Sequence, residues 1–480
     1  MINLILLFPL LACLILYIFK KEFLNTWLLN IYALLHVTVS MFACLGKDFL
    51  PAWQSCSFFA TNMRNSIFLA VMSIVLLAVA IYNNGYLKSE TESPRKIRHY
   101  TYMVLFFVLS MTGAVLSTNL GVSWVFIEGT TLASAYLIYF HKTKHSIEAA
   151  WKYVFICSIG IALAFVGIIL LTFATGNLNS LYFIDLYNNA AAFDPLWLKL
   201  SFVFILFGIG TKMGLAPVHF WLPDAHAQAP SPISALLSAT LLNSAFLMII
   251  NVFGIMVEAN CADYARIMML AMGFLSLFIT AVFVYHINNY KRMLAYSSIE
   301  NMGILIIGLA LGGLATVASI IHLIGHSLVK ASFFLTAGNV LKIYSTKKIK
   351  SVVGLLQVDE KTGWLWIASL VGIVALPPSL LFVSEFMIIK DMFLQHKIAL
   401  CIVFLLLLTI ILYGLTKAVI KMCFSPAADD KYQEWVNEAK KMDWTMYLPQ
   451  IVMLIIVFYL GLLMPEPIVN LINGTVLGVK

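Results

Sequence analysis

Charged residues are scarce in this sequence. Asp, Glu, Lys and Arg together make up 11% of its 480 residues, whereas a typical soluble domain contains about 25%. Hydrophobic residues make up 62%, so the composition excludes an ordinary soluble enzyme and indicates an integral membrane protein. The hydrophobic runs are long enough to cross a bilayer as helices, and the alternating pattern of a membrane β-barrel is missing.

Motifs for nucleotide and redox chemistry are missing as well. The sequence contains no phosphate loop, no dinucleotide-binding glycine fingerprint and no convincing pair of haem-ligating histidines. Its cysteines are scattered without a Cys-x-x-Cys pair, which predicts small packing residues instead of an iron–sulfur or zinc set. They are Cys13, Cys44, Cys56, Cys157, Cys261, Cys401 and Cys423. We therefore expect no cofactor in this chain, and an energy source in a partner protein or an ion gradient.

Hydrophobic runs account for most of the chain. The first, Met1 to Phe19, lacks the basic start and small-residue cleavage site of a signal peptide, so we interpret it as a retained span. Fourteen spans are predicted, at about residues 2–19, 23–45, 65–82, 101–117, 119–140, 153–175, 197–222, 231–256, 264–285, 297–312, 314–343, 364–392, 398–424 and 446–464. The polar segments between them are too short to fold alone, so we predict one all-α membrane domain over 1–480.

The distribution of positive charge predicts the topology. The formal net charge of +8 could suggest a nucleic-acid partner, but 21 of the 30 Lys and Arg residues lie in or beside loops that follow odd-numbered spans. Seven lie on the even-numbered side, and the remaining two, Lys212 and Lys330, lie inside spans. The positive-inside rule then places the odd-numbered loops in the cytoplasm and both termini outside a bacterial or archaeal cytoplasmic (inner) membrane. We expect no nucleic-acid partner.

Two of the predicted spans are interrupted. Glycines at 208, 210 and 214 and prolines at 217 and 223 break the seventh, and prolines at 377 and 378 break the twelfth. Breaks five spans apart suggest two five-helix units, at 100–256 and 262–424, and an odd number of spans inverts the second unit relative to the first. The predicted fold is therefore an all-α membrane protein of about fourteen helices with two inverted five-helix repeats, each containing a broken helix.

Two charged residues stand out in the first unit. Placing Lys212 inside a hydrophobic span costs about 2.5 kcal/mol or more, so such a residue is rarely there without a function. Glu128 lies in another otherwise apolar span of the same unit and is the natural partner of Lys212. We interpret this pair as a proton switch. A static ion pair is the alternative, but apolar residues would be cheaper than paired charges in lipid.

The eleventh span carries His322, His326 and Lys330 at intervals of four residues, which puts all three on one face of a helix. Imidazole groups titrate near neutral pH, so a proton relay through intervening water is the favoured interpretation. Structural polar packing is the first alternative. A metal site is the second, although no nearby stretch supplies an obvious acidic ligand.

Further polar residues lie beside the two breaks. Glu385 follows the break in the twelfth span, in roughly the place that Lys212 occupies in the seventh, and is a candidate for loading and unloading protons at the exit of the path. A helix-end anchor at the interface is its alternative. His219, Asp224 and His226 follow the seventh-span break and could form an antechamber for proton uptake or lie in a solvated turn.

These residues together resemble the antiporter-like membrane subunits shared by respiratory complex I, energy-converting nickel–iron hydrogenases and Mrp-type sodium/proton antiporters. The resemblance covers about residues 100–424. It is carried by Lys212-Met-Gly-Leu-Ala-Pro-Val-His-Phe-Trp-Leu-Pro-Asp-Ala-His226, Tyr290-Lys-Arg-Met-Leu-Ala-Tyr-Ser-Ser-Ile-Glu-Asn-Met-Gly303, His326-Ser-Leu-Val-Lys330 and Ser384-Glu385-Phe386. Within the family, Ala375-Leu-Pro-Pro-Ser-Leu-Leu-Phe-Val-Ser-Glu-Phe386 and Ala337-Gly-Asn-Val-Leu-Lys342 are most similar to the formate hydrogenlyase-like hydrogenase branch.

The resemblance implies a fourteen-span fold with inverted repeats and a hydrated polar axis at mid-membrane. It implies proton-translocating roles for residues at matching positions: Glu128, Lys212, His322, His326, Lys330 and Glu385. One position departs from the family pattern, because the eighth span here carries Asn243 where a Lys or His is usual. Asparagine cannot titrate, so a relay through this point would need water or another donor.

Three functions are compatible with these residues. The leading hypothesis is a proton-translocating subunit of a redox-driven membrane complex, which implies partner subunits such as a nickel–iron hydrogenase or a quinone module. A stand-alone or Mrp-type sodium/proton antiporter subunit is the second, and transport without an electron donor would identify it. A scaffold with a vestigial channel is the third, but a scaffold gains nothing from charges in lipid.

Overall fold

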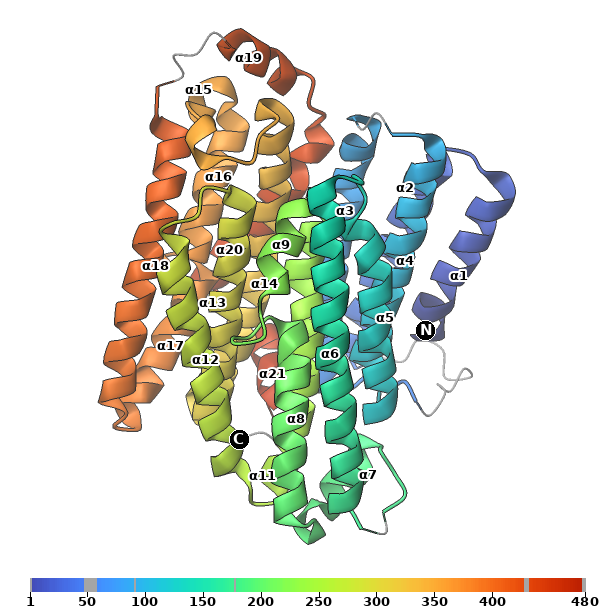
Figure 1. Cartoon of the computed structure of the whole chain (residues 1–480), viewed down its shortest axis with the longest axis vertical. Helices are drawn as coiled ribbons and strands as arrows, with labels where there is room; N and C mark the ends of the chain where they lie inside the picture. Colours follow the sequence, from blue (N-terminus) through green and yellow to red (C-terminus); the bar gives the residue numbers. More distant parts are fainter. Residues whose placement is uncertain (1, 47–57, 90–91, 177, 427–430, 477–480) are drawn as a thin grey trace.

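The chain folds into a bundle of long, roughly parallel and antiparallel helices (Figure 1). The computed structural model describes residues 2–46, 58–89, 92–176, 178–426 and 431–476, so Cys56 lies outside the described residues. Within these ranges the secondary structure is helical, apart from three isolated β-bridges between loops. The prediction of an all-α membrane fold is confirmed.

Eleven spans are single helices. They are α1 (Ile2–Phe19), α2 (Phe23–Cys44), α3 (Met63–Ser89), α4 (Pro94–Leu116), α5 (Leu120–Ile138), α6 (Lys144–Ala174), α12 (Ala262–Val284), α13 (Tyr290–Leu311), α14 (Gly313–Tyr344), α18 (Ile398–Phe424) and α20 (Leu448–Leu462). Shorter helices lie between or after the spans: α7 (Phe183–Asn189), α15 (Leu355–Val358), α19 (Tyr432–Lys440) and α21 (Glu466–Val476).

In the described part of the chain three spans, the seventh, the eighth and the twelfth, are built from more than one piece. The seventh consists of α8 (Pro195–Met213) and α9 (Trp221–Gln228), and the twelfth of α16 (Glu360–Ile373) and α17 (Leu380–Leu394). Among the described residues, 13 helical stretches are long and apolar enough to cross a membrane. The twelfth span is not one of them because its two halves have only 14 and 15 residues. Added to the 13 described stretches, it gives a total of fourteen crossings. Both predicted breaks are thus present.

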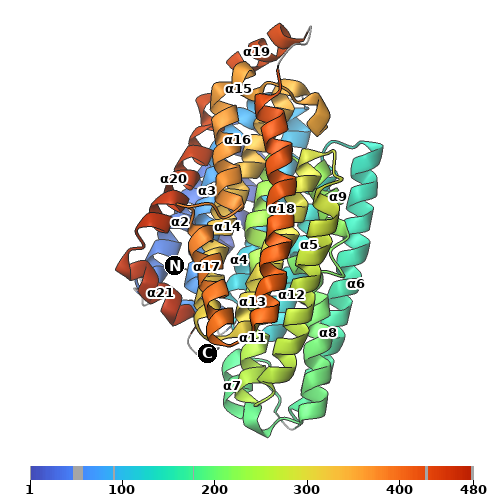
Figure 2. The same ribbon diagram turned by 90° about the vertical axis from the view of Figure 1, so that its left-hand side faces the viewer.

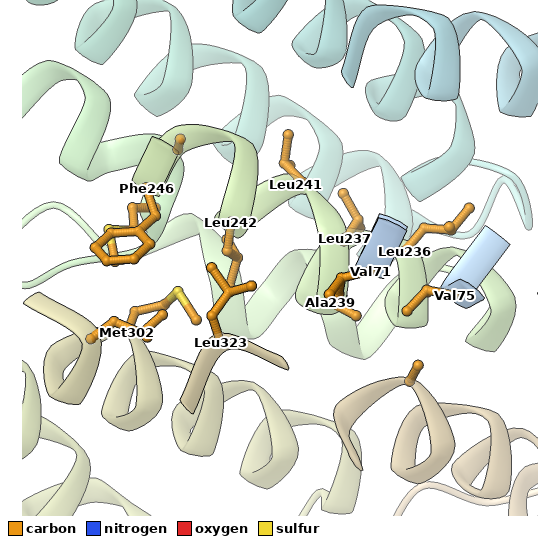
Figure 3. Close-up of a cluster of buried hydrophobic side chains, with 14 of the residues drawn as sticks. Val71, Val75, Leu236, Leu237, Ala239, Leu241, Leu242, Phe246, Met302 and Leu323 are labelled. Atoms are coloured by element: carbon orange, nitrogen blue, oxygen red, sulfur yellow. The ribbon is translucent and has the colours of Figure 1, made fainter. Parts of the chain in front are cut away.

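The eighth span has an irregularity that its sequence does not indicate. Between α10 (Ser231–Leu236) and α11 (Leu242–Glu258) lies a π-helical turn, Leu237–Leu241. Such turns are rare and occur frequently at functional sites. Figure 3 shows Leu236 and Leu237 near Val71 and Val75 of α3, and Leu242, the residue after the turn, beside Leu323 of α14. The turn therefore lies in the apolar interior of the bundle.

Burial separates central helices from peripheral ones. The eighth span and α13 are buried along 100% of their most hydrophobic stretch and α14 along 89%, compared with 22% for α1 and 33% for α18. The turned view shows α18 in front of the bundle and α20 at its left-hand edge (Figure 2). The polar residues of α13 and α14 therefore lie inside protein, where each buried polar group needs a partner.

Matching contacts relate the two halves of the chain. Asn119 and Asn289 cap the first turns of α5 and α13, each accepting hydrogen bonds from two backbone N–H groups. Asn119 forms a β-bridge with Tyr182, which follows α6, and Asn289 forms one with Lys348, which follows α14. In each bridge, the residue after the asparagine donates to the carbonyl before its partner, at 2.9 and 3.1 Å. The same construction at both places is the arrangement expected of structural repeats.

The first break depends on a glycine. Gly214 ends α8 in the left-handed conformation with φ of +78°, which glycine adopts without steric cost. A Cβ atom at this position would lie 2.4 Å from Cδ1 of Leu222 in α9. Side chains form hydrogen bonds with the backbone groups beside the break. The Trp221 indole donates to the Thr211 carbonyl at 2.8 Å, and Ala216 N–H donates to the Ser276 hydroxyl at 2.9 Å. Glycine therefore lets the two half-helices approach closely.

One expectation about the breaks is wrong. Lys212 lies in the last turn of α8, before its break, whereas Glu385 lies in α17, after its break. Counting from the last proline between the two half-helices of each break, Glu385 lies seven residues beyond Pro378, and Asp224, not Lys212, lies seven residues beyond Pro217. Proximity to a proline does not tell on which half-helix a residue will lie.

Candidate functional site

Lys212 lies in a cage of hydroxyl groups. Its side chain is fully buried, and its Nζ lies 3.1 Å from the Tyr153 hydroxyl of α6 and 3.5 Å from Thr130 Oγ1 of α5. The ammonium also lies over the Tyr153 ring, 5.0 Å from its centroid, which adds a favourable cation–π contact. Tyr153 in turn shares a hydrogen bond of 2.6 Å with Ser134. The lysine is thus held by neutral partners from two neighbouring helices.

Glu128 lies near this cage but outside it. Its half-buried carboxylate accepts hydrogen bonds from Thr131 at 2.9 Å and Ser158 at 3.4 Å. The structure forms no direct ion pair between Glu128 and Lys212, although their charges interact through space and Thr130 is two residues from Glu128 along α5. The expected pairing is therefore indirect, because each group is bound by its own set of hydroxyls.

Asn243 connects the eighth span to the polar face of α14. It follows the π-helical turn, and its Nδ2 donates to Ser327 Oγ at 2.7 Å and to the Ala239 carbonyl at 2.7 Å. Its Oδ1 is buried and has no hydrogen-bond partner among the described residues. Ser327 is the neighbour of His326 in sequence. Asn243, where the sequence departs from the family pattern, therefore lies where the first half of the chain meets the polar face of α14 in the second half.

The three polar residues of the eleventh span are fully buried in α14. His322 is bound on both sides, by Asn301 of α13 at 3.0 Å and by Ser384 of α17 at 2.9 Å. Lys330 Nζ donates to the Leu294 carbonyl of α13 at 2.8 Å. Both ring nitrogens of His326 are without a hydrogen-bond partner among the described residues. In that same part of the chain no group of three or more His, Cys, Asp or Glu side chains is placed to hold a metal ion.

Sequence reasoning missed Glu300. It lies in α13 with 6% of its surface exposed, its Oε2 has no partner in the described part of the chain, and its charge interacts favourably with that of Lys330. Together with the half-buried Glu385 it lines a pocket of about 230 Å³. The signal was available, because a carboxylate in the predicted tenth span is as costly as Glu128 in the fifth.

Of the three polar residues after the seventh-span break, the two histidines are inside the protein and Asp224 is half-buried. His219 and His226 are buried, and neither nitrogen of the His226 ring has a hydrogen-bond partner among the described residues. The His226 ring stacks on Phe334 of α14 with centroids 4.9 Å apart. Asp224 forms ion pairs with Lys152 of α6 at 3.2 Å and Arg292 of α13 at 3.3 Å. This arrangement differs from a solvated turn.

Two lysines that the sequence analysis did not single out hold the end of α9. Lys291, fully buried at the start of α13, donates to the Ala229 carbonyl at 2.6 Å. Lys347, which follows α14, donates to the Ala227 carbonyl at 2.7 Å. Cations at a helix C-terminus satisfy carbonyls that lack intrahelical partners and interact favourably with the helix dipole. The half-helix of the first unit is thus secured by the second.

The sequence that contains these charges and breaks matches the model of a known protein family. Residues 117–411 match the family model described as "NADH:quinone oxidoreductase/Mrp antiporter, TM". The chain belongs to this family. The match includes both broken helices and every polar residue that the sequence analysis singled out for translocation.

Relatives of this antiporter-like family member belong to several kinds of complex. The chain is 35% identical over 406 residues to the hydrogenase-4 component F homologue of Methylacidiphilum infernorum, covering 82% of this chain and 84% of the relative. It is 28% identical to subunit N of the NADH-quinone oxidoreductase of Desulforudis audaxviator, covering 65% of this chain and 62% of that one. The similarity therefore extends over nearly the whole length of a hydrogenase-type subunit.

Solved structures share the fold of this family member. A chain in the archaeal membrane-bound sulfane sulfur reductase superposes with a TM-score of 0.88 at 21% identity, covering 100% of this chain and 97% of that one. A chain of the Mrp complex from Dietzia superposes with a TM-score of 0.84 at 17% identity, covering 99% and 96%. The family fold thus spans the whole of this multi-pass membrane protein.

Proposed function

We propose that this chain is the proton-translocating, antiporter-like subunit of a redox-driven membrane complex of the energy-converting hydrogenase type. The supporting comparison is the 35% identity to a hydrogenase-4 component F homologue over most of both chains. Electron transfer takes place in partner subunits, such as a nickel–iron hydrogenase or a quinone module. The complex lies in a bacterial or archaeal cytoplasmic membrane, with both termini of this chain outside.

The observation that carries the proposal is the environment of Lys212. A structural lysine in a protein interior is expected to pair with a carboxylate or with backbone carbonyls, as Lys291 does, because an unpaired buried charge is costly. Lys212 has hydroxyl groups and an aromatic ring as partners instead. The two hydroxyl groups can accept hydrogen bonds from an ammonium and donate to a neutral amine, so the lysine can lose and regain a proton without leaving its cage.

Glu128 sets the state of this switch. Its carboxylate favours the charged lysine through space, so a change in a neighbouring subunit that moves or neutralises Glu128 favours release of the proton. The proton then passes the Asn243–Ser327 contact and reaches the α14 face of His326, Lys330 and His322, and leaves through Glu385. His219, Asp224 and His226 form the uptake side. Buried polar atoms of Asn243 and His326, which have no hydrogen-bond partner among the described residues, provide sites for relaying water.

Replacement of Lys212 by Met tests this function. In the whole complex reconstituted in proteoliposomes, Lys212→Met should abolish redox-driven proton translocation while partner subunits still co-purify. Lys199→Met, in the same helix but only half-buried beside the Tyr264 ring, is the matched control and should translocate protons like the wild type. Undiminished translocation by Lys212→Met would refute the mechanism.

A sodium/proton antiporter component is the second candidate. It is favoured by 27% identity over 351 residues to one of the Na(+)/H(+) antiporter proteins of Alkalihalophilus pseudofirmus, covering 72% of this chain and 70% of the relative. Such a protein exchanges ions without an electron donor. Sodium-dependent proton movement in vesicles that contain no reductant would therefore favour this candidate over the first.

A further inference from the structure

A buried carboxylate that the path above does not use lies beside its last steps. Glu300 is 6% exposed and lies at the middle of α13, a helix that is buried along its whole hydrophobic stretch. Its Oε2 atom has no hydrogen-bond partner among the described residues. Buried charged groups in native proteins are generally paired or hydrogen-bonded, so one with an unsatisfied oxygen requires an explanation.

Hydrogen bonds connect the surroundings of Glu300 to those of Glu385. Asn301, the next residue in α13, bonds to His322 Nε2 at 3.0 Å. The other ring nitrogen of His322 bonds to Ser384, the residue before Glu385, at 2.9 Å. One histidine of α14 therefore fixes α13 and α17 relative to each other, and with them the backbone positions that carry the two carboxylates.

The two carboxylates share a pocket. Glu300 and Glu385 both line the cavity of about 230 Å³ at the break in the twelfth span. The other walls include apolar side chains of α17 and α18, among them Phe382 and Phe386, which are 39% and 56% exposed. The pocket therefore extends from the buried Glu300 to the apolar, membrane-facing surface between α17 and α18, and its width accommodates several water molecules.

We propose that Glu300 and Glu385 form a two-carboxylate proton-binding site that receives protons from Lys330 and passes them out of this chain through the opening of their shared pocket. This inference rests on the proposed function and adds to it a residue and an exit. Two carboxylates around one partly apolar cavity repel each other when both are charged, and a single shared proton relieves that repulsion. The unsatisfied oxygen of Glu300 is the acceptor for that proton.

The transfer balances in protons and charge. The Lys330 ammonium gives one proton to the Glu300 carboxylate, which leaves a neutral amine and a carboxylic acid. Glu300 then passes the proton to Glu385 through water in the pocket and becomes a carboxylate again. Glu385 gives the proton to water at the opening of the pocket, which carries it out of the chain, and Lys330 is reprotonated from the His326 side. One proton has left, and each group is ready for another cycle.

A static ion pair between Glu300 and Lys330 is the competing explanation. Their charges do interact, but the structure forms no ion pair between them, because Lys330 Nζ is bound to the Leu294 carbonyl. A purely structural Glu300 would also have no reason to line a pocket together with a second carboxylate. The geometry therefore favours transfer over pairing.

The test uses the whole complex in proteoliposomes and infrared difference spectroscopy during redox turnover. Glu300→Gln and Glu385→Gln should each abolish proton translocation and remove a carboxylic-acid carbonyl band that appears in the wild type. Glu300→Asp, which keeps the acid group, should restore part of both signals. Glu360→Gln, at the exposed start of the neighbouring α16, is the control and should change neither. Co-purification of partner subunits verifies that each variant is assembled.

The outcomes separate this inference from the proposed function. If Lys212→Met blocks translocation but Glu300→Gln translocates like the wild type with an unchanged carbonyl band, the two-carboxylate site is wrong and the function stands. If Lys212→Met translocates normally, the proposed function itself fails. Translocation that requires sodium, with the requirement lost in Glu300→Gln, would make the pocket a sodium site and overturn the proposal.

Discussion

Replacing Gly214 by alanine should uncouple Lys212 from the relay by displacing the two halves of the seventh span. The left-handed backbone, with φ of +78° at this position, costs an L-residue about 1–2 kcal/mol. The new Cβ would lie 2.4 Å from Leu222 Cδ1, and overpacking of this kind costs about 1–3 kcal/mol in addition. We therefore expect a loss of about 2–5 kcal/mol of stability, which is the sum of these two contributions.

A second glycine separates the two contributions. Gly176 also has a left-handed backbone, with φ of +62°, but a Cβ there would meet no atom within 4 Å. Gly176→Ala should therefore lose only the backbone contribution of about 1–2 kcal/mol and should translocate protons normally. Chemical unfolding in mixed micelles measures both stabilities, and proteoliposomes measure translocation. Equal destabilisation of the two variants, or normal translocation by Gly214→Ala, would refute the argument that contact between the half-helices positions Lys212.

Two further predictions concern residues outside the path. Asn119→Ala and Asn289→Ala should each lower the free energy of unfolding by about 1 kcal/mol, since each removes the same helix cap, and a large difference between them in chemical unfolding would contradict the equivalence of the two caps. Burial, together with the charges of Lys291 and Lys347, lowers the pKa of His141 from its ordinary value of 6.5 to about 4. The unfolded chain therefore binds a proton more readily, so stability should fall as the pH drops from about 6.5 toward 4. His141→Phe should remove this part of the pH dependence, as measured by thermal unfolding across that range.

Span number and span breaks could be predicted because they depend on local sequence. Fourteen hydrophobic runs and two clusters of glycine and proline are visible without knowledge of the neighbours, and the cost of Lys212 in lipid follows from its position in a run. What the sequence could not predict is the identity of partners. Thr130 and Tyr153, the hydroxyls around Lys212, come from two other helices. No spacing within the seventh span indicates them.

Two errors in the predictions from sequence, the place assigned to Glu385 and the omission of Glu300, have different causes. The position of Glu385 was assigned by proximity to prolines, and the half-helix on which a residue lies depends on where the break ends, as the cap at Ser379 shows. Glu300 was overlooked although its position in an apolar span carried the same information as that of Glu128. The π-helical turn before Asn243 had no sequence signal, because its residues are ordinary helix formers.

Because Lys291 and Lys347 of the second half bind the end of α9 in the first half, the chain cannot be divided into two fragments that each fold alone. A fragment that contains only the first unit would keep the carbonyls of Ala227 and Ala229 in its interior but would lack the donors Lys347 and Lys291. A fragment that contains only the second unit would expose those lysines without their acceptors. The two halves are therefore similar in construction without being independent modules, and separately expressed halves should become soluble in detergent and folded only when produced together.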